Sequence, residues 1–245
     1  MSGEAVERVD PAVFELLRGV STATLHTVLY RLGYTRVFMA GLRPFSRGRH
    51  LVGQALTVRY LPAREDFPPP TREEMPAYPQ RVAIEMVRPG DVMVIDAGGD
   101  CTAGTLGDIL ITRIAYRGGH GVVVDGALRD TPAIAGLEIP CFARCAHAGA
   151  SYTRLRAWDV NIPVRCAGVL VLPGDVLVGD GDGVIVIPRA LARQVAELAA
   201  EQERLEAYIR ERVGAGTPLS EAYPPSDAFL AEYRARWNQA PGSES

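Results

Sequence analysis

An aspartate and an Arg-Asp pair stand at a spacing that could build an anion-binding site able to transfer protons. Asp108 follows Gly107, and Arg129-Asp130 comes after twenty intervening residues. The first amide N–H groups of a helix are unpaired and lie at the positive end of its dipole, so a helix opening at Gly107 would bind a carboxylate or phosphate. Glycine there lets a ligand approach the backbone closely. An arginine fork and a carboxylate beside those amides would complete a candidate active site.

One strand–helix–strand unit must bring these residues together. Residues 92–95 and 121–125 are short apolar runs, typical of strands buried on both faces. Between them we expect a helix that ends at Gly118-Gly119, with Thr105 as its N-cap and Asp108 at the third helical position of a capping box. A crossover of this length predicts parallel strands and a right-handed connection.

Ligands of an open parallel sheet bind beyond the carboxyl ends of its strands. Asp96 and Asp100 follow the first strand and Arg129-Asp130 follows the second, so we expect them at one edge together with the helix start. Each residue also has a structural interpretation. Asp108 could be only a capping acid, and Arg129-Asp130 could be a local ion pair at a loop. Their combination at one edge favours a site.

The composition indicates a globular chain without a basic surplus. Of the 245 residues, 47% are hydrophobic and 22% charged, and the net charge of −3 with a pI near 5.9 does not favour nucleic-acid binding. No apolar run reaches membrane-spanning length, and the polar, acidic first ten residues are unlike a signal peptide, so we expect a cytoplasmic protein. No C-x-x-C pair occurs, which predicts reduced and mostly buried thiols at Cys101, Cys141, Cys145 and Cys166.

The chain contains no lysine, because all 26 basic residues are arginine. Schiff-base chemistry on this chain, attachment of pyridoxal phosphate and Walker-type phosphate loops are therefore excluded. A carbon–carbon lyase built on this sequence must use a metal or another electrophile as its electron sink.

Further elements are expected around the central unit. Helices are predicted at 11–18, 22–32, 81–87 and 189–213, and strands at 51–60, 139–143, 164–166, 169–172, 176–178 and 184–187. The segment from 144 to 158 is expected to be irregular. Asp180-x-Asp182-Gly183 starts like a calcium loop but lacks the later ligands, so we expect a tight hairpin.

Two segments are expected to lie outside the main body: the stretch 61–80 and the end of the chain. Six prolines lie between residues 61 and 80, which predicts an exposed loop or arm; the alternative is a lid over the site or a strap onto a neighbouring subunit. Near the end of the chain Phe229, Tyr233 and Trp237 recur at four-residue steps, which suggests docking onto another surface.

At these residues the sequence resembles a known family. The pattern of Asp108, twenty intervening residues and Arg129-Asp130 looks like the signature of class II pyruvate aldolases of the 4-hydroxy-4-methyl-2-oxoglutarate/4-carboxy-4-hydroxy-2-oxoadipate type, which belong to the RraA-like proteins (regulators of ribonuclease E activity). Supporting matches cover roughly residues 15 to 210, at 21–24, 52–58, 125–130 and 173–184.

The resemblance implies an α/β fold of the layered β/β/α swivelling-domain kind, with N-terminal helices and a long C-terminal helix. It further implies one catalytic domain over 1–215, with the insert 61–80, and a tail over 216–245 that docks on a neighbouring subunit. The chain would assemble as a homotrimer or homohexamer with the site at a subunit interface.

The same resemblance assigns roles to the candidate residues. The backbone amides of Gly107, Asp108, Ile109 and Leu110 would cradle the pyruvyl carboxylate, and Arg129 would bind the keto acid. Asp130 would ligate Mg²⁺ or Mn²⁺, and Asp108 would hold a water bound to that cation. An acidic residue of the neighbouring subunit's C-terminal helix would reach the site, with four candidates in this sequence: Glu197, Glu201, Glu203 and Glu206.

The implied activity is divalent-metal-dependent retro-aldol cleavage of a 4-hydroxy-2-oxo acid to pyruvate and a second carbonyl compound, with Asp108 and Arg129 as catalytic residues. Oxaloacetate decarboxylation is an expected side activity, since it creates the same enolate. One alternative is a non-catalytic RraA-like regulator that binds a ribonuclease or helicase, and another is a structural oligomer with a vestigial pocket. A pure binding module has no need for the Asp108 carboxylate. The insert and tail depart from the family pattern and leave the distal group of the substrate open.

Overall fold

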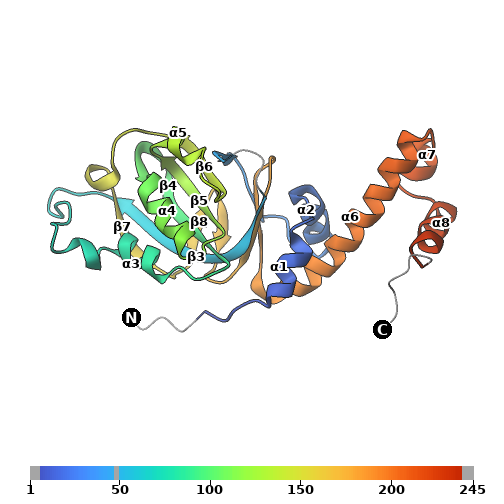
Figure 1. Cartoon of the computed structure of the whole chain (residues 1–245), viewed down its shortest axis with the longest axis horizontal. Helices are drawn as coiled ribbons and strands as arrows, with labels where there is room; N and C mark the ends of the chain where they lie inside the picture. The colour runs from blue at the N-terminus through green and yellow to red at the C-terminus, as the bar shows by residue number, and fades with distance from the viewer. Residues whose placement is uncertain (1–5, 47–49, 239–245) are drawn as a thin grey trace.

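The computed structural model describes residues 6–46 and 50–238, and shows a sheet-centred body from which one long helix extends (Figure 1). Within these residues the main sheet has nine strands in the order β1-β11-β10-β3-β4-β5-β6-β2, with β7 paired to β3. Strands β3, β4, β5 and β6 pair in parallel, whereas the other pairs of the sheet are antiparallel. The strands are β1 Phe38–Met39, β2 Arg43–Pro44, β3 Leu51–Pro62, β4 Asp91–Leu106, β5 Gly121–Leu128, β6 Cys141–Ala146, β7 Leu155–Val160, β8 Val164–Cys166, β9 Val169–Val171, β10 Val176–Gly179 and β11 Val184–Ile187.

Helices lie around this sheet and at the end of the chain. The α-helices are α1 Pro11–Leu17, α2 Thr22–Arg31, α3 Pro79–Met86, α4 Asp108–Tyr116, α5 Thr131–Ile134, α6 Ala192–Gly214, α7 Leu219–Ala222 and α8 Asp227–Asn238. Short 3₁₀ turns are η1 Met75–Ala77, η2 Ser151–Thr153 and η3 Arg189–Leu191. None of the helices in the described residues is both long and apolar enough to cross a bilayer.

Three layers result from the two-residue periodicity of the buried strands. Met93 and Ile95 of β4 pack with the cluster that contains α3 and α4, whereas the alternate residues Val92 and Val94 pack against the β8–β9 ribbon on the opposite face. Helices α1, α2 and α6 cover the β10–β11 end of the sheet. The predicted α/β fold with β/β/α layers, N-terminal helices and a long C-terminal helix is confirmed.

The central unit is confirmed in its order but not in its capping. β4 and β5 are parallel, and α4 between them ends just before Gly118, which has φ +84°. The predicted capping box is wrong, because β4 continues through several bulges to Leu106 and Thr105 belongs to the strand. The Thr105 hydroxyl donates to the carbonyl of Ala127 at 3.2 Å. Asp108 is therefore the first helical residue, and Gly107 is the N-cap.

Other predicted elements shift by a few residues. The segment expected to be irregular contains β7, which pairs antiparallel with β3, and the long helix begins at Ala192 after η3. The Asp180–Gly183 segment is a hairpin turn between β10 and β11, as predicted. The Asp180 carboxylate also accepts hydrogen bonds from the backbone N–H (2.7 Å) and the hydroxyl (2.8 Å) of Thr22 at the start of α2.

The insert and the tail both pack on this chain. The insert is largely exposed, as expected, and its Phe67 meets Trp158 of β7 edge-on at 5.6 Å between ring centroids. In the tail, Phe229 and Tyr233 of α8 are buried against Tyr208 of α6. Docking of the tail on a neighbouring subunit and the boundary at residue 215 stay predictions, and residues 239–245 of the predicted tail lie outside the described part of the chain.

The prediction that all cysteines are reduced thiols is wrong for one pair. Cys101 of β4 and Cys145 of β6 form a disulfide, and β5 lies between these strands. Cys141 and Cys166 are buried thiols as predicted, and burial raises the pKa of Cys141 to about 12. Disulfides are rare in a reducing cytosol. The cytoplasmic location therefore stays a prediction.

Breaking this disulfide should lower the free energy of unfolding by about 2–4 kcal/mol, because the bridge closes a loop of 44 residues in the unfolded chain. Urea denaturation with and without the reductant TCEP measures the difference. The double variant Cys101→Ser/Cys145→Ser should be equally destabilised and should not respond to TCEP. Equal urea midpoints of the wild-type protein with and without TCEP would contradict this expectation.

Candidate active site

A cavity of about 230 Å³ opens where the start of α4 meets the end of β5. All six predicted site residues line it: Gly107, Asp108, Ile109, Leu110, Arg129 and Asp130. Asp96 and Asp100, which were expected at the same edge, do not. Asp96 accepts backbone hydrogen bonds from Gly98 and Arg165, and Asp100 accepts one from Thr102 at 2.6 Å. Because β4 continues past both residues, they lie within the strand instead of in a loop that follows it.

The side chains of Arg129 and Asp130 lie directly against the opening of α4. A methyl group placed on Gly107 would come within 2.5 Å of Asp130 Oδ2 and 3.1 Å of Arg129 Cγ. The backbone N–H of Arg129 donates to the carbonyl of Leu106 at 2.9 Å, which fixes the end of β5 to the residue before the helix N-cap. Glycine at position 107 therefore provides the space that both side chains occupy.

The first turn of α4 offers backbone donors to this cavity. Within the part of the chain that the structure describes, the N–H groups of Asp108 and Leu110 have no acceptor, while that of Ile109 donates to Asp108 Oδ1 at 2.8 Å. These groups lie at the positive end of a nine-residue helix. Such an arrangement suits an anion.

The local ion pair considered from the sequence exists but does not account for the local backbone. Arg129 Nε lies 3.1 Å from Asp130 Oδ2, and the two side chains are 39% and 40% exposed. Pairs this exposed stabilise a protein by about 0–1 kcal/mol. Asp130 has φ +57°, a left-handed conformation that costs on the order of 1–3 kcal/mol for a residue other than glycine. The Arg129–Asp130 ion pair is too weak to offset the backbone strain at Asp130. Backbone strain of this kind is typical of functional positions.

The sequence missed part of the cavity wall. Gln80 and Arg81 from the start of α3, and Ser151 and Tyr152 from η2, also line the cavity. Gln80 is buried and its Nε2 donates to the carbonyl of Thr105 at 2.6 Å. The predicted helix 81–87 already began at Arg81, and Pro79, a favoured first residue of a helix, was the signal that would have extended this helix to Gln80.

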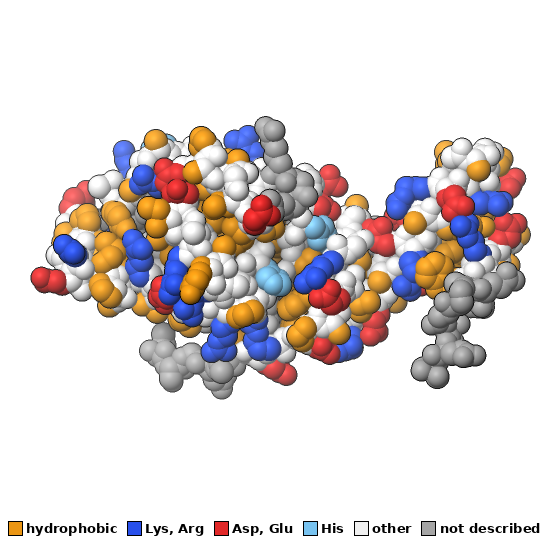
Figure 2. Space-filling model, viewed as in Figure 1, with side chains coloured by type: hydrophobic (Ala, Val, Ile, Leu, Met, Phe, Trp, Pro, Cys, Tyr) orange, Lys and Arg blue, Asp and Glu red, His pale blue; other side chains and the backbone are white. Residues whose placement is uncertain are grey.

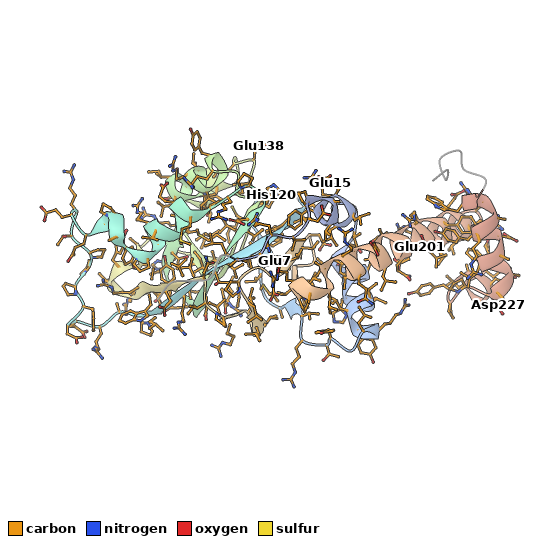
Figure 3. The ribbon with its side chains drawn as sticks, turned by 90° about the horizontal axis from the view of Figure 1, so that it is seen from below. Glu7, Glu15, His120, Glu138, Glu201 and Asp227 are labelled. Atoms are coloured by element: carbon orange, nitrogen blue, oxygen red, sulfur yellow. A yellow bond between two sulfur atoms is a disulfide. The ribbon has the colours of Figure 1, made fainter. Side chains whose placement is uncertain are left out.

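A larger hollow of about 580 Å³ lies at the opposite ends of the parallel strands, where His50, His120 and Glu138 line it. Figure 3 shows His120 and Glu138 on neighbouring segments of the chain. Both histidines bind backbone carbonyls, His50 Nε2 that of Val20 and His120 Nδ1 that of Val52. The C-terminus of α4 lies at this side, so the helix dipole does not favour an anion there.

The four candidate glutamates of the C-terminal helix all have partners within this chain. Glu203 accepts hydrogen bonds from the Ser21 N–H and the Thr24 hydroxyl. Burial raises the pKa of Glu203, but these hydrogen bonds outweigh it and the net pKa is lowered. Glu197 lies 3.9 Å from Arg193, Glu201 pairs with Arg204, and Glu206 accepts from Gln202. Figure 3 shows Glu201 on the part of α6 that extends beyond the sheet.

Comparison with known proteins gives consistent matches. Residues 22–186 match the family model described as RraA-like, Aldolase/RraA. A relative from Halalkalibacterium halodurans, provisionally named as a 4-hydroxy-4-methyl-2-oxoglutarate aldolase, is 42% identical over 130 residues, which are 53% of this chain. The match covers 61% of that relative, less than two thirds of its length.

Two solved structures share the fold. Streptomyces coelicolor RraAS2, described as an unusual member of the RNase ES inhibitor RraA protein family, is 35% identical with a TM-score of 0.75, over 83% of this chain and 98% of the other. An uncharacterized protein from Pseudomonas syringae pv. tomato DC3000 is 27% identical with a TM-score of 0.77, over 88% and 98% of the two chains.

Proposed function

This chain belongs to the RraA-like family of aldolases and RraA proteins, and on that basis we propose that it is a divalent-metal-dependent lyase. Its substrate would be a 4-hydroxy-2-oxo acid, which it would cleave to pyruvate and a second carbonyl compound, with oxaloacetate decarboxylation as a side activity. The observation that carries the proposal is the packing of Arg129 and Asp130 against the Gly107 backbone at the opening of α4.

The donors in the cavity fit a hard cation. Asp108 and Asp130 supply carboxylate oxygens, and the described residues contain no cluster of three or more His, Cys, Asp or Glu that would enclose a metal. Mg²⁺ characteristically takes one or two protein carboxylates and keeps several waters, and Mn²⁺ accepts similar ligands. Asp130 would hold such an ion, which supplies a Lewis acid for the keto oxygen when bound.

The chain's own groups would position the substrate and stabilise charge. The free amides at the start of α4 and the Arg129 guanidinium would bind the carboxylate of the 2-oxo acid. Negative charge develops on the C2 oxygen as the C3–C4 bond breaks, and Arg129 is placed to stabilise it. Asp108 would accept the proton of the C4 hydroxyl, directly or through one water, and return a proton to C3 of the pyruvate enolate.

Pyruvate release from 4-hydroxy-4-methyl-2-oxoglutarate and from oxaloacetate tests the proposal. We expect turnover of both with Mg²⁺, loss of turnover with EDTA and recovery on adding Mg²⁺. Asp108→Ala should reduce aldol cleavage more than decarboxylation, because only cleavage requires removal of a hydroxyl proton. Asp100→Ala, at an aspartate of β4 that is half-buried like Asp108 but lies outside the cavity, is the matched control. Absence of metal-dependent turnover on both substrates would count against a lyase.

Inhibition of a ribonuclease is the second candidate function, favoured by the likeness to RraAS2 over most of the chain. The carboxylate pair in the cavity favours catalysis instead, since a surface that only binds a protein gains nothing from Asp108 beside helix amides. A protein inactive in the assay above but inhibitory toward a ribonuclease would support this second candidate.

The site would lie at an interface between copies of this chain. Ile109 at the cavity is 78% exposed, and Tyr116 on the same face of α4 is 81% exposed. Figure 2 shows hydrophobic side chains among arginines over this part of the surface. Large apolar groups this exposed beside a cavity favour a covering partner, and a second subunit of a trimer or hexamer would provide it.

A further inference from the structure

Arg81 is a cation of the cavity that makes no ion pair with any carboxylate among the described residues. Its Nε atom is buried and has no hydrogen-bond partner in the described residues. The other arginine of the cavity, Arg129, is paired with Asp130. A buried N–H donor without an acceptor is destabilising, and a ligand with an anionic oxygen would supply that acceptor. Arg81 therefore indicates a place for an anionic group.

The start of α3 holds Arg81 in position. Its backbone N–H donates to the carbonyl of Tyr78 at 2.8 Å, so it lies in the first turn of the helix. The neighbouring Gln80 ties this turn to Thr105, two residues before Gly107. Tyr78 in turn packs edge-on against Tyr152 of the cavity wall, at 5.9 Å between ring centroids. Arg81 thus lies on a rigid element fixed to the strand that carries the site.

The charges of the cavity favour a ligand with two acidic groups. Arg81 and Arg129 cancel Asp108 and Asp130, so the ionisable lining is neutral overall. A divalent cation held by Asp130 would leave two positive charges, which a dianion balances. The two arginines also belong to different walls, Arg129 to the end of β5 beside the helix amides and Arg81 to α3. A 2-oxo acid bound to the amides through one carboxylate would have its distal end available to α3.

We infer that Arg81 is the specificity-determining residue of this site, and that it binds a distal carboxylate of the substrate. The inference rests on the proposed function, since it assumes that Arg129 and the α4 amides bind the 2-oxo acid end. The guanidinium is suited to this role because its planar fork matches a carboxylate through two parallel N–H donors. The enzyme would then select dicarboxylic over monocarboxylic 2-oxo acids.

Two ligands that differ only at the distal end test this inference without turnover. Titration calorimetry with Mg²⁺ compares 2-oxoglutarate with 2-oxopentanoate, in which a methyl group replaces the distal carboxylate. We expect the wild-type protein to bind the diacid on the order of tenfold to a hundredfold more tightly. In Arg81→Gln that ratio should fall to near one, and Arg81→Lys should retain part of it. Arg88→Gln, an exposed arginine just after the same helix, should keep the full ratio.

The outcomes separate the two levels of the proposal. Equal affinities in the wild-type protein, or an undiminished ratio in Arg81→Gln, would overturn the role of Arg81 while leaving the 2-oxo acid site intact. Absence of binding by both ligands in the presence of Mg²⁺ would overturn the proposed function and this inference with it. A merely structural Arg81 would lower the melting temperature of Arg81→Gln without changing the ratio. Arg81→Lys keeps the test decisive if the glutamine variant does not fold.

Discussion

Replacing Arg129 with alanine is expected to lower kcat/KM for pyruvate-forming cleavage on the order of a hundredfold to a thousandfold. Arg129 lies against Gly107, where the α4 amides would hold the same carboxylate, so the variant loses both a substrate contact and a positive charge facing the developing enolate. The loss should appear in kcat as well as in KM, because the charge on the C2 oxygen grows only as the C3–C4 bond breaks. Steady-state kinetics of pyruvate release measure both constants.

Two comparisons show whether this loss is local. Arg165→Ala removes an exposed arginine of β8, outside the cavity, and should leave the kinetics unchanged. Mg²⁺ binding should survive in Arg129→Ala, because the proposed ligand Asp130 is retained. Full activity of Arg129→Ala would remove the basis for the lyase, and a change in KM alone would reduce Arg129 to a binding residue.

The parallel strands were predictable because their residues carry the signal locally. The apolar runs of β4 and β5 are bounded by Pro-Gly and Gly-Gly turns, and burial on both faces leaves no alternation. Residues 97–106 of β4 lack such a signal, since they are mostly Ala, Gly, Thr and Asp. They are a strand only because they pair with β5 through a series of bulges. Tertiary pairing decided their structure, and sequence periodicity could not show it.

The sequence predicted that the residues of the candidate site lie together, but the capping role that it suggested for Asp108 was wrong. Asp108 was assigned to a capping box with Thr105, whereas Thr105 is in the strand and Asp108 begins the helix. Asp108 lies at the cavity because the β4–α4–β5 crossover places the start of α4 at the carboxyl ends of the parallel strands. This placement does not depend on which residue caps the helix. Arg81 was placed in the predicted helix 81–87, but its position at the cavity was missed because it depends on the packing of α3 beside Thr105, which the sequence does not show. The Cys101–Cys145 pair was missed because it depends on the order of β4, β5 and β6, which cysteine spacing does not encode.

Adding a single methyl group at Gly107 should disable the site while leaving the fold in place. Gly107 has φ −119° and ψ 179°, an extended conformation that alanine adopts without strain. The new methyl group would lie 2.5 Å from Asp130 Oδ2 and 3.1 Å from Arg129 Cγ, so these side chains must move. Both contacts are with side chains and not with backbone, and rotation of Asp130 can relieve the closer one. The substitution should therefore displace the Asp130 and Arg129 side chains and leave the backbone fold unchanged.

Gly107→Ala is expected to lower kcat/KM on the order of a hundredfold, since displacements near 1 Å at a reacting centre can have that effect. Mg²⁺ affinity, measured by calorimetry, should fall too, because the displaced oxygen belongs to the proposed metal ligand. The melting temperature should fall by only about 2–4 °C, because alanine is a poorer N-cap than glycine by about 1 kcal/mol. Gly181→Ala is the matched control, because a methyl group there meets no atom within 4 Å. A Gly107→Ala protein with wild-type kinetics and Mg²⁺ affinity would show that substrate and cation bind elsewhere, because the contact between Gly107 and Asp130 is too close to survive the added carbon unchanged.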